Sequence, residues 1–449
     1  MQYDQIQHAL ITDVGVRRSH NQDDYAVQLA PDNESFIQNG HIFLVADGMG
    51  GHAVGEKASK KAKQEIPHLY LKHASEGPGP ALRRAFLEAN AVIHAIGQEN
   101  PEFRGLGTTG TALVIRQDGA WIGHVGDSRV YRLRAGVLEQ LSFDHSLVWA
   151  LAQQQGVDPD ELSDVRKNVI IRSLGPDALV KVDVEGPHPI LPNDVYLLCS
   201  DGLSNPVTNE EIGSIMHALP PAEACKFLVE LANLRGGPDN ITVIIVQVQP
   251  NPNDMASGLV PMTPPPRKPS VVKRLFKKVL SRISWPLAML ILGFLLAVSF
   301  ILCMVFEWTG GAVLFVLAAI CVGIGLIGLG IQSQNAQARD EESDGPAEPR
   351  APNIYRQYRC PIDQAMLDRF VKIDTQLLAH LQGKQWPHDA KAYQAHRDQV
   401  EAFLKVNDLP SAFRELCRGL QILGQSFNKH RQKEESFQPK WDGAPAGNA

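Results

Sequence analysis

Short apolar runs separated by turn residues alternate with longer amphipathic stretches through the first half of the chain. Runs of roughly four to eight β-branched and aromatic residues predict strands, and apolar residues three or four positions apart predict helices. The predicted strands are Phe43–Ala46, Ala112–Ile115, Trp121–Val125, Val130–Leu133, Val137–Leu141, Val195–Cys199 and Ile241–Val248. The predicted helices are Glu56–Ile66, Ala81–Gln98, Leu147–Gln155 and Pro221–Leu234.

The connections between these strands are mostly short. Only Arg134, Ala135 and Gly136 separate two of the predicted strands. A tight turn of this kind joins antiparallel neighbours, since parallel strands need a long crossover connection. Residues 1–250 therefore predict one mixed domain in which antiparallel pairing dominates.

The composition changes after residue 250. Residues 251–284 begin with a proline-rich linker, which cannot build a core. They end in a predicted amphipathic helix, Val271–Ile283, whose apolar positions are interleaved with lysines and arginines. Such a helix binds the surface of an anionic membrane.

Two apolar runs follow, Trp285–Phe306 and Gly311–Ile331. Each is long enough to cross the roughly 30 Å hydrocarbon core of a bilayer as a helix, and neither has a polar stripe. The alternative is a buried helical hairpin in a soluble core. The basic cluster before the first run predicts that both soluble parts lie in the cytoplasm, attached to the inner membrane. Ala319 and Gly323 are spaced for close helix packing.

The remainder divides into an acidic, proline-containing linker at 332–353, a helical cytoplasmic domain at 354–432 and a tail at 433–449 that we expect to be disordered. The helical domain contains three predicted helices: Ile362–Leu381, Asp389–Lys405 and Ser411–Phe427. It is predicted to be a small bundle that packs on itself or on a neighbour. Docking of another protein is a further possibility.

Overall composition restricts the function. The 449 residues are 44% hydrophobic and carry a formal charge of −6, which argues against nucleic-acid binding. The six cysteines show no CxxC spacing, so neither zinc nor a disulfide framework is indicated, and a reducing compartment fits best. Met1–Val16 has no apolar core of signal-peptide length, so we expect no export of the first domain.

The most informative stretch is Leu44–Ser59, where an apolar run stops at Asp47 and is followed by Gly48, Gly50 and Gly51. We expect Asp47 at the tip of a strand, with glycines that let the backbone turn tightly around whatever the acid holds. A P-loop does not fit, because Glu56 separates Gly55 from the lysine that should follow it.

Further acids lie close to the ends of strands: Asp23, Asp127, Asp201 and Asp239. Acids at strand ends can gather on one edge of a sheet sandwich. An all-oxygen ligand set without clustered His or Cys selects hard cations such as Mg²⁺ or Mn²⁺. Each Asp-Gly pair taken alone is also typical of an ordinary turn.

Seven motifs resemble, in order, those of the metal-dependent (type 2C) protein serine/threonine phosphatases in their bacterial form, over nearly all of residues 5–249. They are Thr12–Asp23, Asp47–His52, Gly107–Gly110, Gly126–Arg129, Asp144–Ser146, Ser200–Leu203 and Asp239–Asn240. The resemblance implies an α+β fold with a central antiparallel β-sandwich flanked by helices on both faces. After it we expect a two-helix transmembrane hairpin and a small all-α C-terminal region.

The resemblance also implies roles for individual residues. Asp47 would bridge two metal ions and the Gly48 carbonyl would be a further ligand. Asp201 and Asp239 would complete the core site, and Asp23 would hold metal-bound water. These four acids and the carbonyl, with Asp127 for a third and weaker site, form the expected ligand set. Arg18 matches the arginine that binds the substrate phosphate, for which its planar guanidinium is suited.

Three positions depart from or complicate this pattern. Gln22 stands where many members have Glu, which would weaken one direct metal contact. Met49 stands where animal relatives have His, as in bacterial members, so the usual candidate for a general acid is missing. His52 is close by, and we expect its role to be structural.

The implied reaction is hydrolysis of phosphoserine and phosphothreonine in proteins by water activated between two Mn²⁺ or Mg²⁺ ions. A cysteine-phosphatase mechanism does not fit, because neither Cys199 nor Cys360 has an arginine six residues later. The expected partners are phosphorylated proteins and an opposing Ser/Thr kinase. The alternatives are a catalytically silent phosphoprotein adaptor and hydrolysis of small phosphoesters. We expect Ser146–Arg172, the flap region, to border the substrate groove and influence specificity.

Overall fold

The computed structural model describes residues 2–50, 52–103, 105–162, 165–166, 169–250, 292–299, 301, 316–324, 326 and 350–436. The chain forms two compact units. One unit combines Met1–Gly258 with Pro349–Ala449, and the other is Leu259–Glu348. The C-terminal helices therefore belong to the same unit as the first 250 residues.

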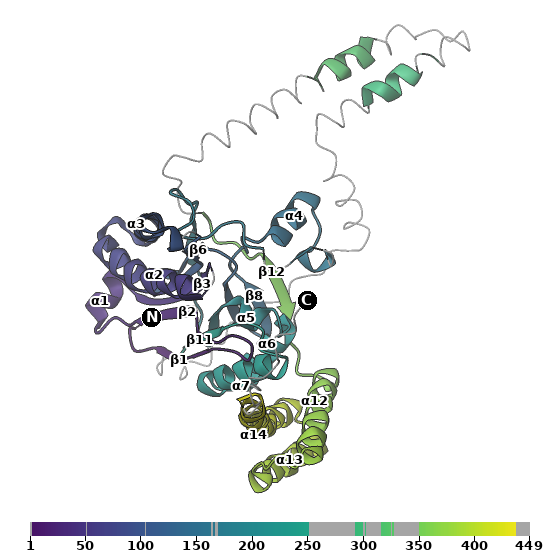
Figure 1. Cartoon of the computed structure of the whole chain (residues 1–449). Coiled ribbons are helices and arrows are strands. Elements are labelled where there is room, and N and C mark those ends of the chain that lie inside the picture. The colour runs from purple at the N-terminus through teal and green to yellow at the C-terminus, as the bar shows by residue number, and fades with distance from the viewer. Residues whose placement is uncertain are drawn as a thin grey trace, which may run out of the picture. The chain divides into compact units, whose positions relative to one another are not determined.

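Two antiparallel sheets form the centre of the first unit (Figure 1). The first sheet has the order β1 (Ile6–Asp13), β11 (Ile241–Val248), β10 (Val195–Cys199), β7 (Arg129–Arg134), β8 (Val137–Gln140), β12 (Arg356–Arg359). The second has the order β2 (Asp23–Gln28), β3 (His41–Met49), β5 (Gly110–Arg116), β6 (Gly119–Val125), β9 (Asp183–His188), and β4 (Gly107–Thr108) pairs with β3.

Successive side chains along each strand pack on opposite faces of its sheet, and both faces are buried. In β3, Phe43 and Val45 belong to the cluster between the sheets, whereas Leu44 contacts the helices outside. In β11, Ile244 lies in the cluster between the sheets and Ile245 in the cluster on the opposite face. A strand that packs on both faces is apolar at every position, as these runs are.

Helices cover both outer faces of the sandwich. The second sheet is covered by α2 (His52–Lys72) and α3 (Pro78–Glu99), and the first by α6 (Asn209–Ala218) and α7 (Pro221–Leu234). Helix α6 begins at a capping box in which Thr208 and Glu211 satisfy each other's backbone N–H groups. Shorter helices are α1 (Asn33–Gln38), α4 (Leu147–Gln155), α5 (Asp201–Ser204), η1 (Ala74–Glu76), η2 (Pro101–Phe103) and η3 (Pro159–Glu161).

Three C-terminal helices extend the core outward from α7 (Figure 1). They are α12 (Gln364–Gly383), α13 (Ala390–Lys405) and α14 (Leu409–Ser436). Phe370 of α12 lies with its ring centroid 6.1 Å from Phe227 of α7 and 5.0 Å from Phe413 of α14. These rings belong to one continuous apolar cluster, so the helical region shares its core with the sandwich.

The α+β class and the flanking helices are confirmed. The predicted bounds of β10, β11, α4 and α7 agree with the structure, while α2 and α3 are longer than expected. Strand β3 does not stop at Asp47, because Gly48 and Met49 pair with Thr108 and Gly107 of β4. The expectation of Asp47 at a strand tip is therefore wrong.

The C-terminal part also differs from the sequence prediction. Arg350, assigned to a linker, forms an isolated bridge with β9, and β12 adds a strand to β8. Helix α14 ends at Ser436, inside the segment expected to be a disordered tail, and 437–449 lie outside the described residues.

In the second unit, residues 292–299 and 316–324 are helical. A Cβ added to Gly293 would lie 2.8 Å from Val322 Cγ2, so the two helical pieces touch there. Within the described residues, nothing lies within 4 Å of a Cβ built at Gly323, so they do not show the close approach predicted there.

Within the described residues, no helix combines the length and apolar character needed to cross a membrane. The larger part of both predicted spans, the proline-rich linker and the predicted basic helix lie outside the described residues.

The contact between α14 and α7 contains a buried carboxyl group. Glu230 of α7 accepts a hydrogen bond from Asn428 Nδ2, and a Cβ added to Gly424 would lie 2.7 Å from Glu230 Oε1. Burial, reinforced by the charge of Asp13, raises the pKa of Glu230 from 4.5 to about 7, against the opposing effects of Asn428 and Arg431. The folded chain therefore retains this proton at a pH where the unfolded chain has lost it.

Stability should consequently fall as pH rises toward and through about 7, since a raised pKa in the folded state contributes stability only below it. Glu230→Gln keeps an acceptor for Asn428 and removes the charge. We expect the variant to lose less stability than the wild type between about pH 5 and pH 8, measured by denaturant unfolding of the full chain. Glu223→Gln, which removes the carboxylate bound to Arg418, is the control. An unchanged pH dependence in Glu230→Gln would contradict the assignment.

Candidate metal centre

The sheet topology brings the candidate acids to one edge of the sandwich. Asp23 begins β2 and faces Asp47 of β3 across the antiparallel pair. Asp201 follows β10 and Asp239 precedes its antiparallel neighbour β11, so both lie at the same end of the first sheet. Asp127 lies where the chain passes from β6 of one sheet to β7 of the other.

Asp23 is held by hydroxyl groups from the opposite sheet. Ser200 Oγ and Thr242 Oγ1 donate to Asp23 Oδ2 at 2.7 and 2.8 Å. Its other oxygen, Oδ1, is buried and accepts no hydrogen bond from any described residue. Burial raises the pKa of Asp23 to about 7, and the charges of Asp201 and Asp239 add to this effect.

The same crowding affects the other acids. Burial raises the pKa of Asp47 well above its usual value, and the charges of the four other acids raise it further. Burial and the charge of Asp239 raise the pKa of Asp201 to about 6. Several carboxylates thus share a poorly hydrated site in which each disfavours ionisation of the others.

Asp127 lines a pocket together with Ser146 and Asp160 of the flap region. Burial raises its pKa well above the usual value, and the charges of Asp201 and Asp144 contribute. Arg129 opposes this shift but is itself paired with Asp144 at 2.7 Å. Asp127 Oδ1 and Asp201 Oδ1 are also buried, with no hydrogen-bond partner in the part of the chain that the structure describes.

Two glycines allow these acidic turns to approach each other. A Cβ at Gly202 would lie 1.9 Å from the Asn240 carbonyl oxygen, so only glycine lets the turn after Asp201 pack against the start of β11. A Cβ at Gly48 would lie 2.3 Å from the Gly55 carbonyl oxygen. The backbone at Gly48 therefore lies too close to α2 for a side chain to fit between them.

Arg18 lies beside the acids, with Nη2 bonded to Asp239 Oδ2 at 2.8 Å. Its side chain is 45% exposed, so the guanidinium reaches the surface at the edge where the acids gather. A two-pronged donor in this position can bind an anion brought to the site.

The donor chemistry fits hard divalent cations. Such a cation would satisfy the buried carboxylate oxygens of Asp23, Asp127 and Asp201 that have no hydrogen-bond partner among the described residues. Among the described residues, no set of three or more His, Cys, Asp or Glu side chains is already arranged as a metal cage. The acids are close enough to perturb one another electrostatically, and their mutual repulsion opposes closer approach.

Several residues that hold the acids were not assigned a role from sequence. Asn240 donates to the Val14 and His20 carbonyls and accepts from the Gln22 N–H, which ties the N-terminal loop to β11. Thr108 and Thr109 bond the backbone of Asp47. Thr108, Thr109 and Asn240 fall within the recognised motifs, whereas Thr242 has no sequence signal beyond its place in a strand.

Of the positions that complicate the family pattern, the structure describes the side chain of Gln22 but not that of His52. Gln22 is buried beside Gly55, and its backbone carbonyl accepts from the Gly48 N–H at 3.1 Å. The side chain of His52 lies outside what the structure describes. Its expected structural role stays a prediction.

An antiparallel sandwich with buried carboxylates at one edge defines an α+β protein with an oxygen-lined candidate metal centre. Comparison with known proteins identifies its family. The sequence profile of protein phosphatase 2C matches residues 16–231. The serine/threonine phosphatase stp of Listeria monocytogenes is 36% identical over 242 residues, which are 53% of this chain and 93% of the relative. The chain therefore belongs to the protein phosphatase 2C family, whose members depend on metal ions.

The chain is also similar to a mycobacterial phosphatase and to solved structures of it. The serine/threonine protein phosphatase PstP of Mycobacterium tuberculosis is 34% identical over 249 residues, 54% of this chain and 45% of its own length. The crystal structure of that phosphatase matches at 32% identity with a TM-score of 0.48, covering 55% of this chain and 99% of the other. A structure of the PstP catalytic domain, which contains two manganese ions, has a TM-score of 0.46 at 32% identity.

Because the acids are crowded, removing one of them should weaken metal binding without destabilising the metal-free fold. In Asp201→Asn we expect Mn²⁺ to raise the melting temperature much less than in the wild type, because a ligand stabilises a fold only by binding to it. With a chelator at about pH 8, the variant should be at least as stable as the wild type, because it has one buried charge fewer. Asp177→Asn, at an exposed acid, is the control. An Mn²⁺-induced shift equal to that of the wild type would remove Asp201 from the ligand set.

Proposed function

We propose that this chain is a metal-dependent protein serine/threonine phosphatase that hydrolyses phosphoserine and phosphothreonine in proteins. The observation that carries the proposal is the set of buried carboxylates at one sandwich edge with oxygens left unpartnered. Family membership supports the same conclusion, and the names of the relatives specify serine/threonine phosphatases.

In this proposal Asp47, Gly48, Asp201 and Asp239 hold two Mn²⁺ or Mg²⁺ ions. Asp23 orders water beside them, and Asp127 contributes to a weaker third site. The ions would supply a nucleophile from water near neutral pH and neutralise charge on the phosphoryl oxygens. Ser200 and Thr242 fix the orientation of the Asp23 carboxylate through their hydroxyl groups.

Arg18 binds the phosphoryl group in this scheme. Its bond to Asp239 holds one prong of the guanidinium near the acids, and the exposed part of the side chain faces incoming substrate. Retention of the core acids Asp47, Asp201 and Asp239 favours the enzyme over a silent phosphoprotein adaptor on the same fold. The opposing partner would be a Ser/Thr kinase.

Hydrolysis of a phosphothreonine peptide by the full chain, with and without added Mn²⁺, tests this function. Turnover should require the metal and fall by at least about a thousandfold in Asp47→Ala, since the two ions supply most of the catalysis. Asp177→Ala is the control at an exposed acid. Metal-independent turnover, or turnover retained in Asp47→Ala, would refute the proposed chemistry. A folded chain that binds the phosphopeptide without hydrolysing it would favour the adaptor.

We further propose that residues 285–306 and 311–331 attach the enzyme to the cytoplasmic membrane, with both parts of the first unit in the cytoplasm. The support is the apolar sequence of these runs and the exposure of large apolar side chains on their described parts, such as Phe294 (67%) and Ile320 (50%). The basic segment 271–283 would add attraction to anionic lipids.

Replacing 285–331 by a Gly/Ser linker of equal length should move the chain from the membrane fraction to the supernatant. The measurement belongs at raised salt, because salt screens the attraction between the basic segment and lipids. A chain with only 251–270 replaced should stay in the membrane fraction. Continued sedimentation of the 285–331 replacement with membranes at raised salt would contradict the proposed anchor.

A further inference from the structure

Residues 350–360, which we call the strap, lie beyond the part of the chain that matches the family. At one end of the strap, the Arg350 N–H donates to the Val184 carbonyl of β9 at 2.9 Å. At the other end, β12 pairs with β8, and the Cys360 N–H donates to the Gly136 carbonyl at 3.0 Å. The strap therefore links the edge strands of the two sheets.

Strand alternation turns two strap side chains, Arg356 and Tyr358, toward the same side. Both are partly buried, whereas Gln357 and Arg359 are exposed. The Arg356 guanidinium lies 5.0 Å from the centroid of the Tyr358 ring and bonds Asp158 at 2.9 Å as well as Asp160. These acids belong to the flap region, so the strap fixes η3 of the flap.

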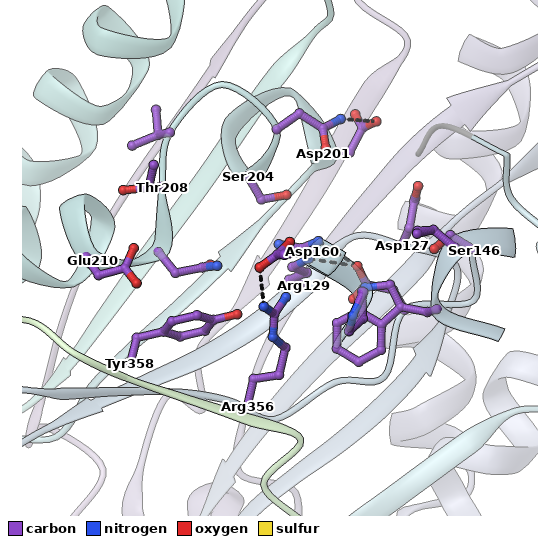
Figure 2. Close-up of a pocket in the computed structure, with 17 residues that line it drawn as sticks. Asp127, Arg129, Ser146, Asp160, Asp201, Ser204, Thr208, Glu210, Arg356 and Tyr358 are labelled. Atoms are coloured by element: carbon purple, nitrogen blue, oxygen red, sulfur yellow. Dashed lines mark hydrogen bonds and ion pairs between the residues drawn. The ribbon is translucent and has the colours of Figure 1, made fainter. Parts of the chain in front are cut away.

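A pocket of about 400 Å³ opens between the strap, the flap and the acids of the metal centre (Figure 2). Asp127 and Asp201 line it on the side of the metal centre. Arg356 and Tyr358 line it on the side of the strap, and Glu210 of α6 lines it beside Tyr358. A protein substrate whose phosphate lies at the metal centre would extend into this pocket.

The charges lining the pocket are mostly paired within it. Arg129 is bound to Asp144, and Arg356 is bound to Asp160. Apart from the acids of the metal centre, this leaves Glu210, for which the described residues contain no ion pair. Glu210 lies in the first turn of α6.

Two hydroxyl groups in the pocket also lack partners. Tyr358 Oη and Ser204 Oγ are both buried and make no hydrogen bond within the described residues. Buried polar groups in proteins are nearly always satisfied, so unpartnered ones that line a pocket indicate a polar ligand. The ligand should offer hydrogen-bond donors, because Glu210 can only accept them when ionised.

We propose that this pocket binds a lysine or arginine side chain of the phosphoprotein substrate, close in sequence to the phosphorylated residue. Glu210 pairs with the cationic head, and Tyr358 and Ser204 accept further hydrogen bonds from it. The inference rests on the proposed function and assigns a substrate preference to the same site. An acidic side chain of the substrate would instead be repelled in this pocket by Glu210 and Asp160.

The strap makes this preference a property of the full chain, since Tyr358 forms one wall of the pocket and Arg356 holds the flap beside it. The test is a set of phosphothreonine peptides in which a single lysine replaces alanine at successive positions on either side of the phosphothreonine. The quantity compared is kcat/KM for each lysine peptide relative to the all-alanine peptide, measured with the full chain and Mn²⁺.

We expect lysine at one or two positions to raise kcat/KM by about tenfold, the order of one charge-assisted hydrogen bond. In Glu210→Gln this ratio should fall to about one, because the pairing charge is gone. Tyr358→Phe keeps the ring and should lose part of the ratio. Glu99→Gln, an exposed acid on α3 outside the pocket, should keep the ratio.

A ratio near one at every position in the wild type, or a ratio that survives in Glu210→Gln, would overturn the proposal. A ratio unchanged in Tyr358→Phe would show that the Tyr358 hydroxyl of the strap does not contribute to binding the lysine side chain. If the chain hydrolyses no phosphopeptide at all, the proposed function fails. Binding of unphosphorylated lysine and alanine peptides, measured by fluorescence anisotropy, then tests the lysine-binding pocket separately. Binding of the lysine peptide that depends on Glu210 would support it, and equal binding of both peptides would refute it.

Discussion

The constraint on which the structure depends is the crowding of buried carboxylates at one edge of the sandwich. Asp23 of β2, Asp47 of β3 and Asp201, which follows β10, meet there with Asp127 and Asp239. Burial raises the pKa of the first three. Much of the surrounding architecture serves this arrangement. Hydroxyl groups of Ser200 and Thr242 cross from one sheet to the other to hold Asp23, and Gly202 removes the side chain that would force β10 and β11 apart.

The same logic explains why a two-sheet scaffold suits this chemistry. Like charges brought this close would separate if their loops could move. Here each acid is attached to a strand whose neighbours are apolar on both faces, so packing of the sheets resists that separation. The burial of the apolar strands supplies the free energy that keeps these acids together.

Local patterns predicted much of the fold. The bounds of β10, β11, α4 and α7 follow from short apolar runs and helical spacing, and the candidate acids were identified because each lies near a predicted strand end. The extension of β3 past Asp47 was missed, because Gly48 and Met49 have poor strand propensity and are held by pairing with β4. The role of Thr242 was missed because its partner, Asp23, is distant in sequence.

The position of the C-terminal region could not be predicted for a different reason. Arg356 lies in a short segment with no strong strand signal, and its partners Asp158 and Asp160 are nearly two hundred residues earlier. Likewise, the apolar faces of α12 and α14 indicate a buried surface but not which surface covers them. Only the structure shows that Phe370 packs against Phe227.

The addition of β12 to β8 matters for how this protein is divided for study. A fragment that ends near residue 250, where the resemblance to the family stops, would leave β8 as an open edge with unpaired backbone groups. Open edges of this kind invite pairing between molecules. The fragment would also lack the C-terminal helices that cover part of the apolar surface of α7. Poor solubility of such a fragment would therefore result from the exposed β8 edge and α7 surface, and not from a property of the full chain.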